Sequence, residues 1–221
     1  GQRLPLGAAA FVLFELLEGL AYVHELTDAK GSPHGLVHRD VSPHNVLLGF
    51  AGEVKLADFG IAQVGARIEA GTAEEGVRGK RAYMAPEQAR GEPLDARADI
   101  FAAGLVLFEL LTGRRAYEGR AEVLLEAARE GRVDALATVA PELHPALCEV
   151  ADRALASERG ARFQSAREFR DALRVAFELA DVRPDREALR ERMRATVEES
   201  SRAATRPAAE RTLTVQDPTG T

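Results

Sequence analysis

The sequence contains no tryptophan, and Cys148 is its only cysteine among 221 residues. A single cysteine excludes a disulfide within the chain, so we expect a reducing, cytoplasmic compartment. Aromatic residues make up only 5% of the chain, so a core must be built mainly from Leu, Val and Ala. No signal peptide is visible, and no apolar run approaches the roughly 18 residues of a membrane span. We therefore expect no membrane segment in this chain.

The chain also lacks an excess of positive charge, because its formal net charge is −6. Nucleic-acid-binding domains ordinarily present a basic surface, so this charge argues against a nucleic-acid partner. No set of His and Cys residues has the spacing of a zinc site. Hydrophobic residues make up 46% and charged residues 29%, a mixture typical of a globular domain with a sizeable core.

Methionine is missing from the start of the chain, which begins with Gly1 and has its first methionine at Met84. An open reading frame starts with Met, so we expect a processed chain or a piece of a longer protein. A methionine trimmed from a position before Gly1 is the alternative.

Hydrophobic periodicity predicts a mainly helical domain. Apolar residues recur at helical spacing over 8–25, and residues 100–111 are apolar nearly all round, which indicates a buried helix. Short apolar runs at 46–48 and 54–56, separated by a turn with glycines, predict a small hairpin. Amphipathic surface helices are expected over residues 121–129, 145–155 and 165–179.

Two segments lack the pattern of a packed core. Residues 61–81 have little periodicity and four glycines, which predicts a long functional or disordered loop. The composition shifts after about Asp181: residues 183–199 predict a charged helix, and residues 200–221 a linker or disordered tail. We therefore expect a core domain over residues 1–181, and a charged helix with a tail over residues 182–221.

Residues suited to phosphoryl transfer lie in three short runs: H-R-D-V-S-P-H-N at 38–45, D-F-G at 58–60 and A-P-E at 85–87. This chemistry needs a carboxylate that orients the attacking hydroxyl and accepts its proton, and oxygen ligands that hold Mg²⁺ against the phosphates. Asp40 can supply the carboxylate, and Asn45 an amide oxygen. Asp58 approaches from a separate turn, and Gly60 lets that turn bend sharply.

In this order, and with Asn five residues after Asp, the runs resemble the signature of eukaryotic-type (Hanks-type) serine/threonine protein kinases. The resemblance covers roughly residues 4–180 and is strongest to bacterial members, because of the Y-M-A-P-E-Q run. It implies a mostly α, protein-kinase-like C-terminal lobe, a helical bundle with a small catalytic β-hairpin. The N-terminal lobe is absent, since neither G-x-G-x-x-G nor V-A-x-K precedes the first helix.

The resemblance implies that Asp40 is the catalytic base and that Asn45 and Asp58 hold Mg²⁺ and ATP. The alternative for each residue is a turn residue or a helix cap. The coincidence of order and spacing favours the catalytic interpretation.

The resemblance implies structural roles for a second group of residues. His38 and Phe59 are expected to stack in a hydrophobic column that links the two lobes of a kinase. Asp99 is expected to hold the backbone of the catalytic loop, with a helix cap as the alternative. Glu87 and Arg162 are expected to form an ion pair inside the lobe, whose disruption would cost about 3–5 kcal/mol.

Two positions depart from the usual pattern of the family. Ser42 stands where most of these kinases have a lysine that contacts the transferred phosphate, and Lys80 follows Gly79 where Thr is usual. We predict an exchange in which Lys80 reaches Asp40 and the phosphate from the opposite wall, while Ser42 supplies the hydroxyl. The alternative is that Lys80 is a solvated loop residue and the enzyme is impaired.

The loop after Asp58 has one candidate for regulation, because Thr72 is its only Ser/Thr hydroxyl before the A-P-E run. In related kinases the residue at Arg39 pairs with a phosphorylated loop, so Thr72 is a candidate phosphorylation site. The alternative is that Glu74 and Glu75 supply a permanent negative charge.

The resemblance implies ATP- and Mg²⁺-dependent phosphorylation of Ser/Thr hydroxyls on a protein substrate. Activity is expected to depend on an N-terminal lobe encoded upstream. One alternative is a non-catalytic, pseudokinase-like binding module, against which the retention of Asp40, Asn45 and Asp58 argues. Another is a small-molecule phosphotransferase with an H-x-D-x-x-x-x-N run, which the A-P-E run and the long loop before it disfavour.

Overall fold

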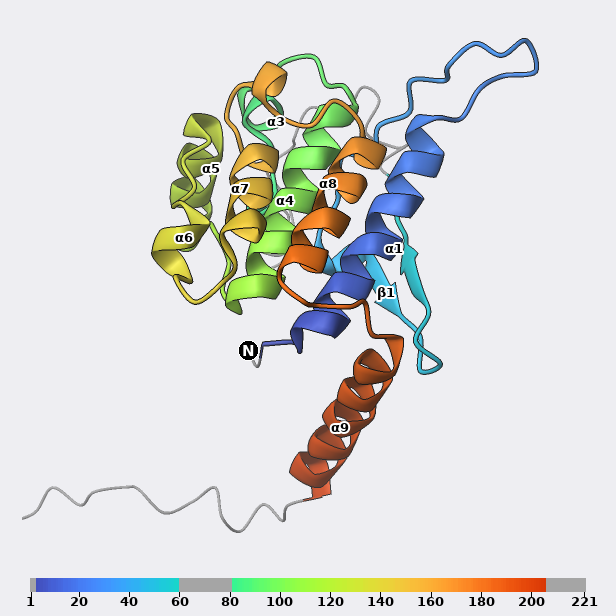
Figure 1. Ribbon diagram of the computed structural model, residues 1–221. Coiled ribbons are helices and arrows are strands. Elements are labelled where there is room, and N and C mark those ends of the chain that lie inside the picture. The colour runs from blue at the N-terminus through green and yellow to red at the C-terminus, as the bar shows by residue number, and fades with distance from the viewer. Residues whose placement is uncertain (1–2, 60–80, 206–221) are drawn as a thin grey trace, which may run out of the picture.

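A computed structural model describes residues 3–59 and 81–205 (Figure 1). Most of these residues are helical, and the only sheet among them has two strands. In chain order the elements are α1 (Leu6–His24), η1 (Pro43–Asn45), β1 (Val46–Leu48), β2 (Val54–Leu56), α3 (Pro86–Arg90), α4 (Ala96–Thr112), α5 (Ala121–Glu130), α6 (Leu136–Val139), α7 (Pro145–Ala154), η3 (Arg159–Ala161), α8 (Ala166–Leu179) and α9 (Arg186–Thr205).

Helix α4 is the central element, and its side chains are buried on nearly every face. It begins at Asp95, whose side chain accepts a hydrogen bond from the backbone N–H of Arg97, and ends at Gly113 with φ 77°. Gly104 lets α7 approach closely, because a Cβ there would lie 3.1 Å from Ala154 Cβ and from Leu155. Figure 1 shows α1, α7 and α8 packed around α4, as the sequence pattern of a fully apolar helix predicted.

Helix α1 packs against α4, α8, α9 and β2. By length and composition alone this helix could also cross a membrane, contrary to the expectation that no run in the sequence is apolar enough. Within the described residues it is a core helix, because 56% of its most apolar stretch is buried against other elements. Leu13, Leu17 and Leu20 are each fully buried.

The two strands form the predicted antiparallel hairpin, with Val46 opposite Leu56 and Leu48 opposite Val54. The hairpin lies against α1, mainly through β2 (Figure 1). Its register places the start of β1 and the end of β2 at the same end, and both positions adjoin residues singled out for catalysis.

The structure differs from the sequence-based expectations at several places. The short helices α3 and α6 were not predicted, because five and four residues are too few to show a helical period. Helix α9 continues to Thr205, so the first residues of the expected tail are helical. That segment has no proline before Pro207 to stop the helix. Of the loop expected at 61–81, residues 61–80 lie outside the described residues, as do residues 206–221 of the tail.

Candidate active site

Asp99, in the first turn of α4, binds the backbone of residues 38–45, the catalytic loop of the proposed site. Its Oδ2 accepts a hydrogen bond of 2.7 Å from the N–H of His38, and its Oδ1 accepts one of 2.8 Å from the N–H of Arg39. The carboxylate is 1% exposed, so these charge-assisted bonds form away from water. The buried helix and the loop, about 60 residues apart in sequence, are therefore joined at two consecutive amides.

His24 is a third partner of Asp99, which the sequence did not reveal. Its Nε2 lies 2.8 Å from Asp99 Oδ2, and its side chain is 8% exposed. His24 ends α1, so the same carboxylate joins α1, α4 and the catalytic loop. A histidine in the last turn of a helix usually has a local role at that terminus, so its type and position did not indicate this contact.

Arg39 has a left-handed backbone conformation, with φ 69°. Such a conformation is costly for a residue with a Cβ and persists when surrounding contacts determine it. Asp99 holds the N–H of Arg39, and Gln88 Nε2 of α3 donates a bond of 2.8 Å to its carbonyl. Gln88, the residue after the A-P-E run, is a second contact that was not predicted from the sequence.

His38 connects the catalytic loop to the end of β2. The residue is fully buried, its Nε2 lies 3.0 Å from the carbonyl oxygen of Ala57, and its Nδ1 lies 3.3 Å from the backbone nitrogen of Asp40. A ring with its proton on Nε2 satisfies both contacts. The ring also lies against Phe59, with 4.6 Å between ring centroids, so the two residues expected to stack are in contact.

Asn45 and Asp58 lie at the same end of the hairpin. Asn45 Nδ2 donates a bond of 2.7 Å to the carbonyl of Asp40, and the Asn45 carbonyl accepts one of 2.8 Å from the N–H of Ala57. Asp58 follows directly, is exposed and has φ 55°. Since Asn45 uses its amide nitrogen within the loop, its amide oxygen is the atom suited to a metal ligand.

This donor set fits Mg²⁺ bound together with phosphates. Magnesium prefers oxygen ligands, and proteins commonly supply one or two while substrate phosphates and water complete the octahedron. Asn45 and Asp58 provide two such oxygens. Among residues 3–59 and 81–205, no cluster of three or more His, Cys, Asp or Glu could hold a metal by itself.

Glu87 and Arg162 form a buried ion pair between α3 and the segment before α8. Arg162 Nη1 and Nη2 donate to the two carboxylate oxygens of Glu87 at 2.8 and 2.9 Å, and both side chains are at most 2% exposed. Arg162 also donates to the carbonyls of Arg97, Ala156 and Ser157. The pair expected from sequence is therefore formed, with three additional backbone partners.

Tyr83, in the run before A-P-E, is 4% exposed and donates a hydrogen bond to Glu109 of α4. Burial, reinforced by the neighbouring carboxylate, raises the pKa of Tyr83 well above its usual value, so the hydroxyl keeps its proton. This contact ties the segment that follows residue 80 to the central helix.

Several sequence-predicted residues have no structural description. Gly60, Thr72 and Lys80 lie outside the described residues. Ser42, the proposed counterpart of Lys80, is 2% exposed and precedes the turn η1. The structure therefore brings together Asp40, Asn45, Asp58 and the residues that support them, and leaves the exchange of Ser42 and Lys80 as a prediction.

The site has counterparts in known proteins. Residues 2–169 match the protein kinase domain family. A tyrosine-protein kinase, MasK of Myxococcus xanthus, is 40% identical over 171 residues, which cover 77% of this chain and 26% of that protein. The serine/threonine-protein kinase PknB of Mycolicibacterium smegmatis is 40% identical over 148 residues, covering 64% of this chain and 23% of PknB.

The fold agrees with a solved kinase structure. The crystal structure of the Mycobacterium tuberculosis PknI kinase domain matches with a TM-score of 0.56 and 31% identity, over 79% of this chain and 56% of that domain. The chain thus spans about a quarter of the two curated relatives and about half of a kinase domain. It belongs to the protein kinase family and is similar to the bacterial, Hanks-type members.

Proposed function

We propose that this chain is the C-terminal lobe of a bacterial serine/threonine protein kinase that transfers the γ-phosphoryl group of MgATP to a hydroxyl of a protein. One observation carries the proposal. Asn45 and Asp58 lie at one end of a hairpin that His38 and Asn45 tie to the loop carrying Asp40. Proton acceptor and metal ligands are thereby held in one small unit, which positioning catalysis requires.

In this mechanism Asp40 orients the acceptor hydroxyl and takes its proton. The hydroxyl oxygen forms a bond to the γ-phosphorus as the bond to the β,γ-bridging oxygen breaks, so ADP leaves with the electron pair. Mg²⁺, when bound, neutralises charge on the phosphates. Asn45 and Asp58 are the residues that would hold it, and Asp99, His24 and Gln88 act by fixing the loop that carries Asp40.

The exposed apolar side chains of the hairpin fit a nucleotide and a second lobe. Leu47 is 54% exposed and lies two positions after Asn45, on the face of β1 opposite to that of Val46. Leu48, Phe50 and Phe59 are 36%, 68% and 37% exposed. Leu47 and Phe59, which are near Asn45 and Asp58 in sequence, suit contact with a purine base, and the remaining exposed apolar side chains suit contact with the N-terminal lobe of a kinase. The chemistry of this surface therefore supports the lobe assignment.

The test is MgATP binding and autophosphorylation by this chain and by a form extended through the coding sequence upstream, with Asp40→Asn as the control. We expect the extended form to transfer phosphate and Asp40→Asn to slow transfer by about 10²–10⁴-fold. A well-folded extended form without transfer would sink the proposal and favour the non-catalytic binding module.

The exchange between Ser42 and Lys80 is tested in the same active form. Lys80→Ala is expected to lower turnover by about tenfold or more, because the cation that stabilises the transferred phosphate is lost. Lys80→Thr combined with Ser42→Lys restores the arrangement usual in the family and is expected to recover part of the turnover. If Lys80→Ala turns over like the unaltered protein, the exchange does not occur.

The acceptor residue has a second candidate, because MasK, named as a tyrosine kinase, is as similar as PknB. Phosphoamino-acid analysis of the autophosphorylated protein and of a generic protein substrate separates the two. Phosphotyrosine alone would replace the Ser/Thr assignment, whereas phosphoserine or phosphothreonine would support it.

A further inference from the structure

The hairpin that carries the metal ligands is too short to be stable by itself. Each strand has three residues, and an isolated two-stranded hairpin is marginal at best in water. One end is held by the contact of His38 with Ala57. The position of Asn45 and Asp58 therefore depends on what holds the other end, at the turn between the strands.

Helix α9 holds that turn through Arg186, the first residue of the helix. Arg186 Nε lies 3.1 Å from the carbonyl oxygens of both Ala51 and Gly52, and such bonds from a charged donor are stronger than neutral ones. Gly52 has φ 80°, and a Cβ there would lie 2.8 Å from Arg186 Cγ and 2.9 Å from Arg190 Cγ. The backbone of the turn thus packs directly against the side-chain stems of Arg186 and Arg190, and a residue with a Cβ at position 52 would crowd them.

Helix α9 is also fixed by an apolar contact. Leu189 is fully buried against Ala8 and Val12 of α1. Val46 and Val54, one from each strand, pack partly buried against the same cluster. Leu189 therefore supports the inner face of the hairpin as well as the start of α1, and Val46 is the immediate neighbour of Asn45.

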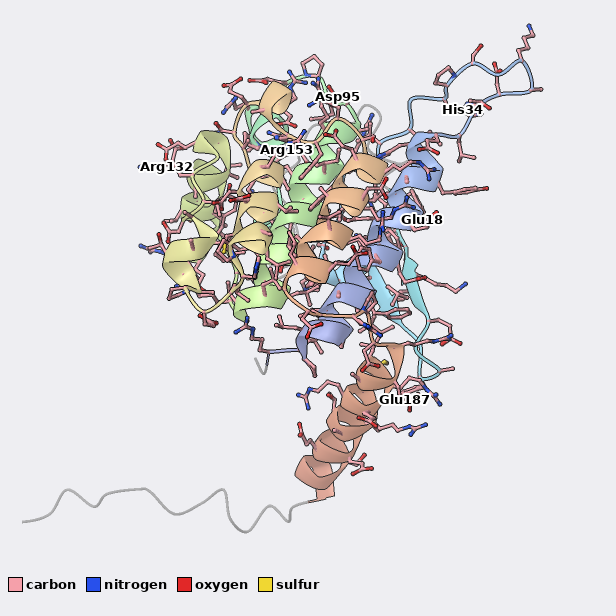
Figure 2. All side chains as sticks on the ribbon, in the orientation of Figure 1. Glu18, His34, Asp95, Arg132, Arg153 and Glu187 are labelled. Atoms are coloured by element: carbon pink, nitrogen blue, oxygen red, sulfur yellow. The ribbon has the colours of Figure 1, made fainter. Side chains whose placement is uncertain are left out.

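The segment that leads into α9 is fixed against the start of α1. Asp185 donates its N–H to the carbonyl of Gly7 at 2.9 Å, and its carboxylate accepts a bond from the N–H of Ala188 at 2.9 Å. A Cβ on Gly7 would lie 2.9 Å from Asp185 Cβ, so the two segments pass very close to each other. Figure 2 shows Glu187 on this first turn of α9, below the tip of the hairpin.

A continuous ladder joins the turn to the metal ligands. The N–H of Gly49 donates to the carbonyl of Glu53 at 2.8 Å, the strands pair in register, and the N–H of Ala57 donates to the carbonyl of Asn45. A change at the turn is therefore transmitted along two short, paired strands. The family match ends at residue 169, so α9 lies outside the part of the chain that matches the kinase family.

We propose that α9 is a positioning element of the active site. Docked through Arg186 and Leu189, it keeps Asn45 and Asp58 at the spacing that a Mg²⁺–nucleotide complex needs, and its release loosens the hairpin and weakens metal binding. This inference rests on the metal role given to Asn45 and Asp58 above. The C-terminal half of α9 extends away from the body of the protein (Figure 1). A contact that pulls on this half can therefore undock the helix from the hairpin and change the metal site.

The test compares Arg186→Ala and Leu189→Ala with Arg194→Ala, which removes an equal charge from a position farther along the same helix. The first readout is hydrogen exchange at the N–H groups of Gly49 and Ala57, in the full chain. We expect exchange about tenfold faster in the first two variants and unchanged in the control. Arg186→Lys, whose ammonium can donate to the same carbonyls, is expected to restore slow exchange in part.

The second readout is binding of Mn²⁺ with a non-hydrolysable ATP analogue, followed by electron paramagnetic resonance. Weaker binding in Arg186→Ala and Leu189→Ala, with recovery in Arg186→Lys, is the expected result. Unchanged exchange at Ala57 in both variants overturns the proposal, and faster exchange with unchanged Mn²⁺ affinity overturns the positioning role. If the form extended through the coding sequence upstream also binds no Mn²⁺, the metal role of the proposed function fails, while the exchange data still decide whether α9 holds the hairpin.

Discussion

Asp99 and His38 are joined by a hydrogen bond of 2.7 Å from the backbone N–H of His38 to the buried carboxylate of Asp99. The same carboxylate holds the N–H of Arg39 and the ring of His24. One side chain thus satisfies two consecutive amides, His38 and Arg39, in a part of the loop that belongs to no helix or strand. The backbone conformation of the loop at His38 and Arg39 therefore depends on a side chain of the central helix.

Replacing Asp99 by Ala is expected to destabilise the protein by about 3 kcal/mol or more, because the donors of His38 and Arg39 lose their acceptors. Asp99→Asn retains one carbonyl oxygen and is expected to have an intermediate effect. Urea unfolding measures the loss. Asp152→Ala is the matched control, since its carboxylate accepts one bond, from the N–H of Leu136, far from the catalytic loop. In the form extended upstream, that variant should keep phosphoryl transfer, which Asp99→Ala should lose.

Arg162 and Glu87 are expected to contribute unequally, although they form one ion pair. Removing one partner of a buried pair costs about 3–5 kcal/mol. Arg162→Ala also leaves the carbonyls of Arg97, Ala156 and Ser157 without their donor, whereas Glu87→Ala leaves those bonds in place. We therefore expect Arg162→Ala at the upper end of that range or above it, and Glu87→Ala at a smaller cost within the range, as measured by urea unfolding.

The double variant of this pair provides a sharper comparison. Replacement of a buried ion pair by apolar residues of similar volume is often neutral or stabilising. Here Glu87→Met with Arg162→Met is expected to remain destabilised, because three carbonyls lose their donor. A double variant as stable as the unaltered protein would show that these carbonyls find other partners.

Asp58 has a left-handed backbone with φ 55°, which glycine adopts without a steric penalty. Asp58→Gly is therefore expected to be more stable than Asp58→Ala by about 1 kcal/mol, while both lose binding of Mn²⁺ with an ATP analogue. Asp181 is exposed with φ 53°, so Asp181→Gly and Asp181→Ala provide the matched pair, with a similar stability difference and unchanged metal binding. Equal stabilities of Asp58→Gly and Asp58→Ala would contradict this reasoning.

The features that the sequence predicted are those encoded locally. The hairpin strands are confirmed at 46–48 and 54–56, because short apolar runs and a glycine turn lie within a dozen residues. The long helices of the core domain are confirmed for the same reason, since each has its own apolar period or, in the central helix, a continuous apolar run. The residues proposed for catalysis were singled out because three motifs coincided in order and spacing, and their roles stay predictions.

The features that the sequence did not reveal depend on contacts between distant residues. His24 and Gln88 are ordinary polar residues on helices, and their partners lie 75 and 49 residues away. Helix α9 was expected as a charged helix, since Leu189 is almost alone among charged neighbours. Its burial depends on Ala8 and Val12, at the other end of the chain. No local pattern can report such contacts.

The lowered pKa of Asp95 predicts that the stability of the lobe falls in acid. Hydrogen bonds from Arg97, together with its charge, lower the pKa of Asp95 from 3.8 to about 2. A carboxylate with a lowered pKa stabilises the folded state above the unfolded pKa, and this contribution is lost as the pH falls from about 4 to about 2. Because 41% of the side chain is exposed, screening reduces the contribution to about 1 kcal/mol or less.

Asp95→Asn isolates that charge, since asparagine caps a helix about as well as aspartate and keeps an oxygen for the N–H of Arg97. Urea unfolding of both proteins between about pH 2.5 and about pH 6, a range chosen around the two pKa values, gives the stability difference at each pH. We expect a difference of about 1 kcal/mol or less at the upper end, in favour of Asp95, that falls towards zero with acid. Other carboxylates with a lowered pKa, such as Glu168, titrate in both proteins, so their contributions cancel in the stability difference. A difference that does not change with pH would mean that Asp95 acts on α4 as a neutral cap, without a contribution from its charge.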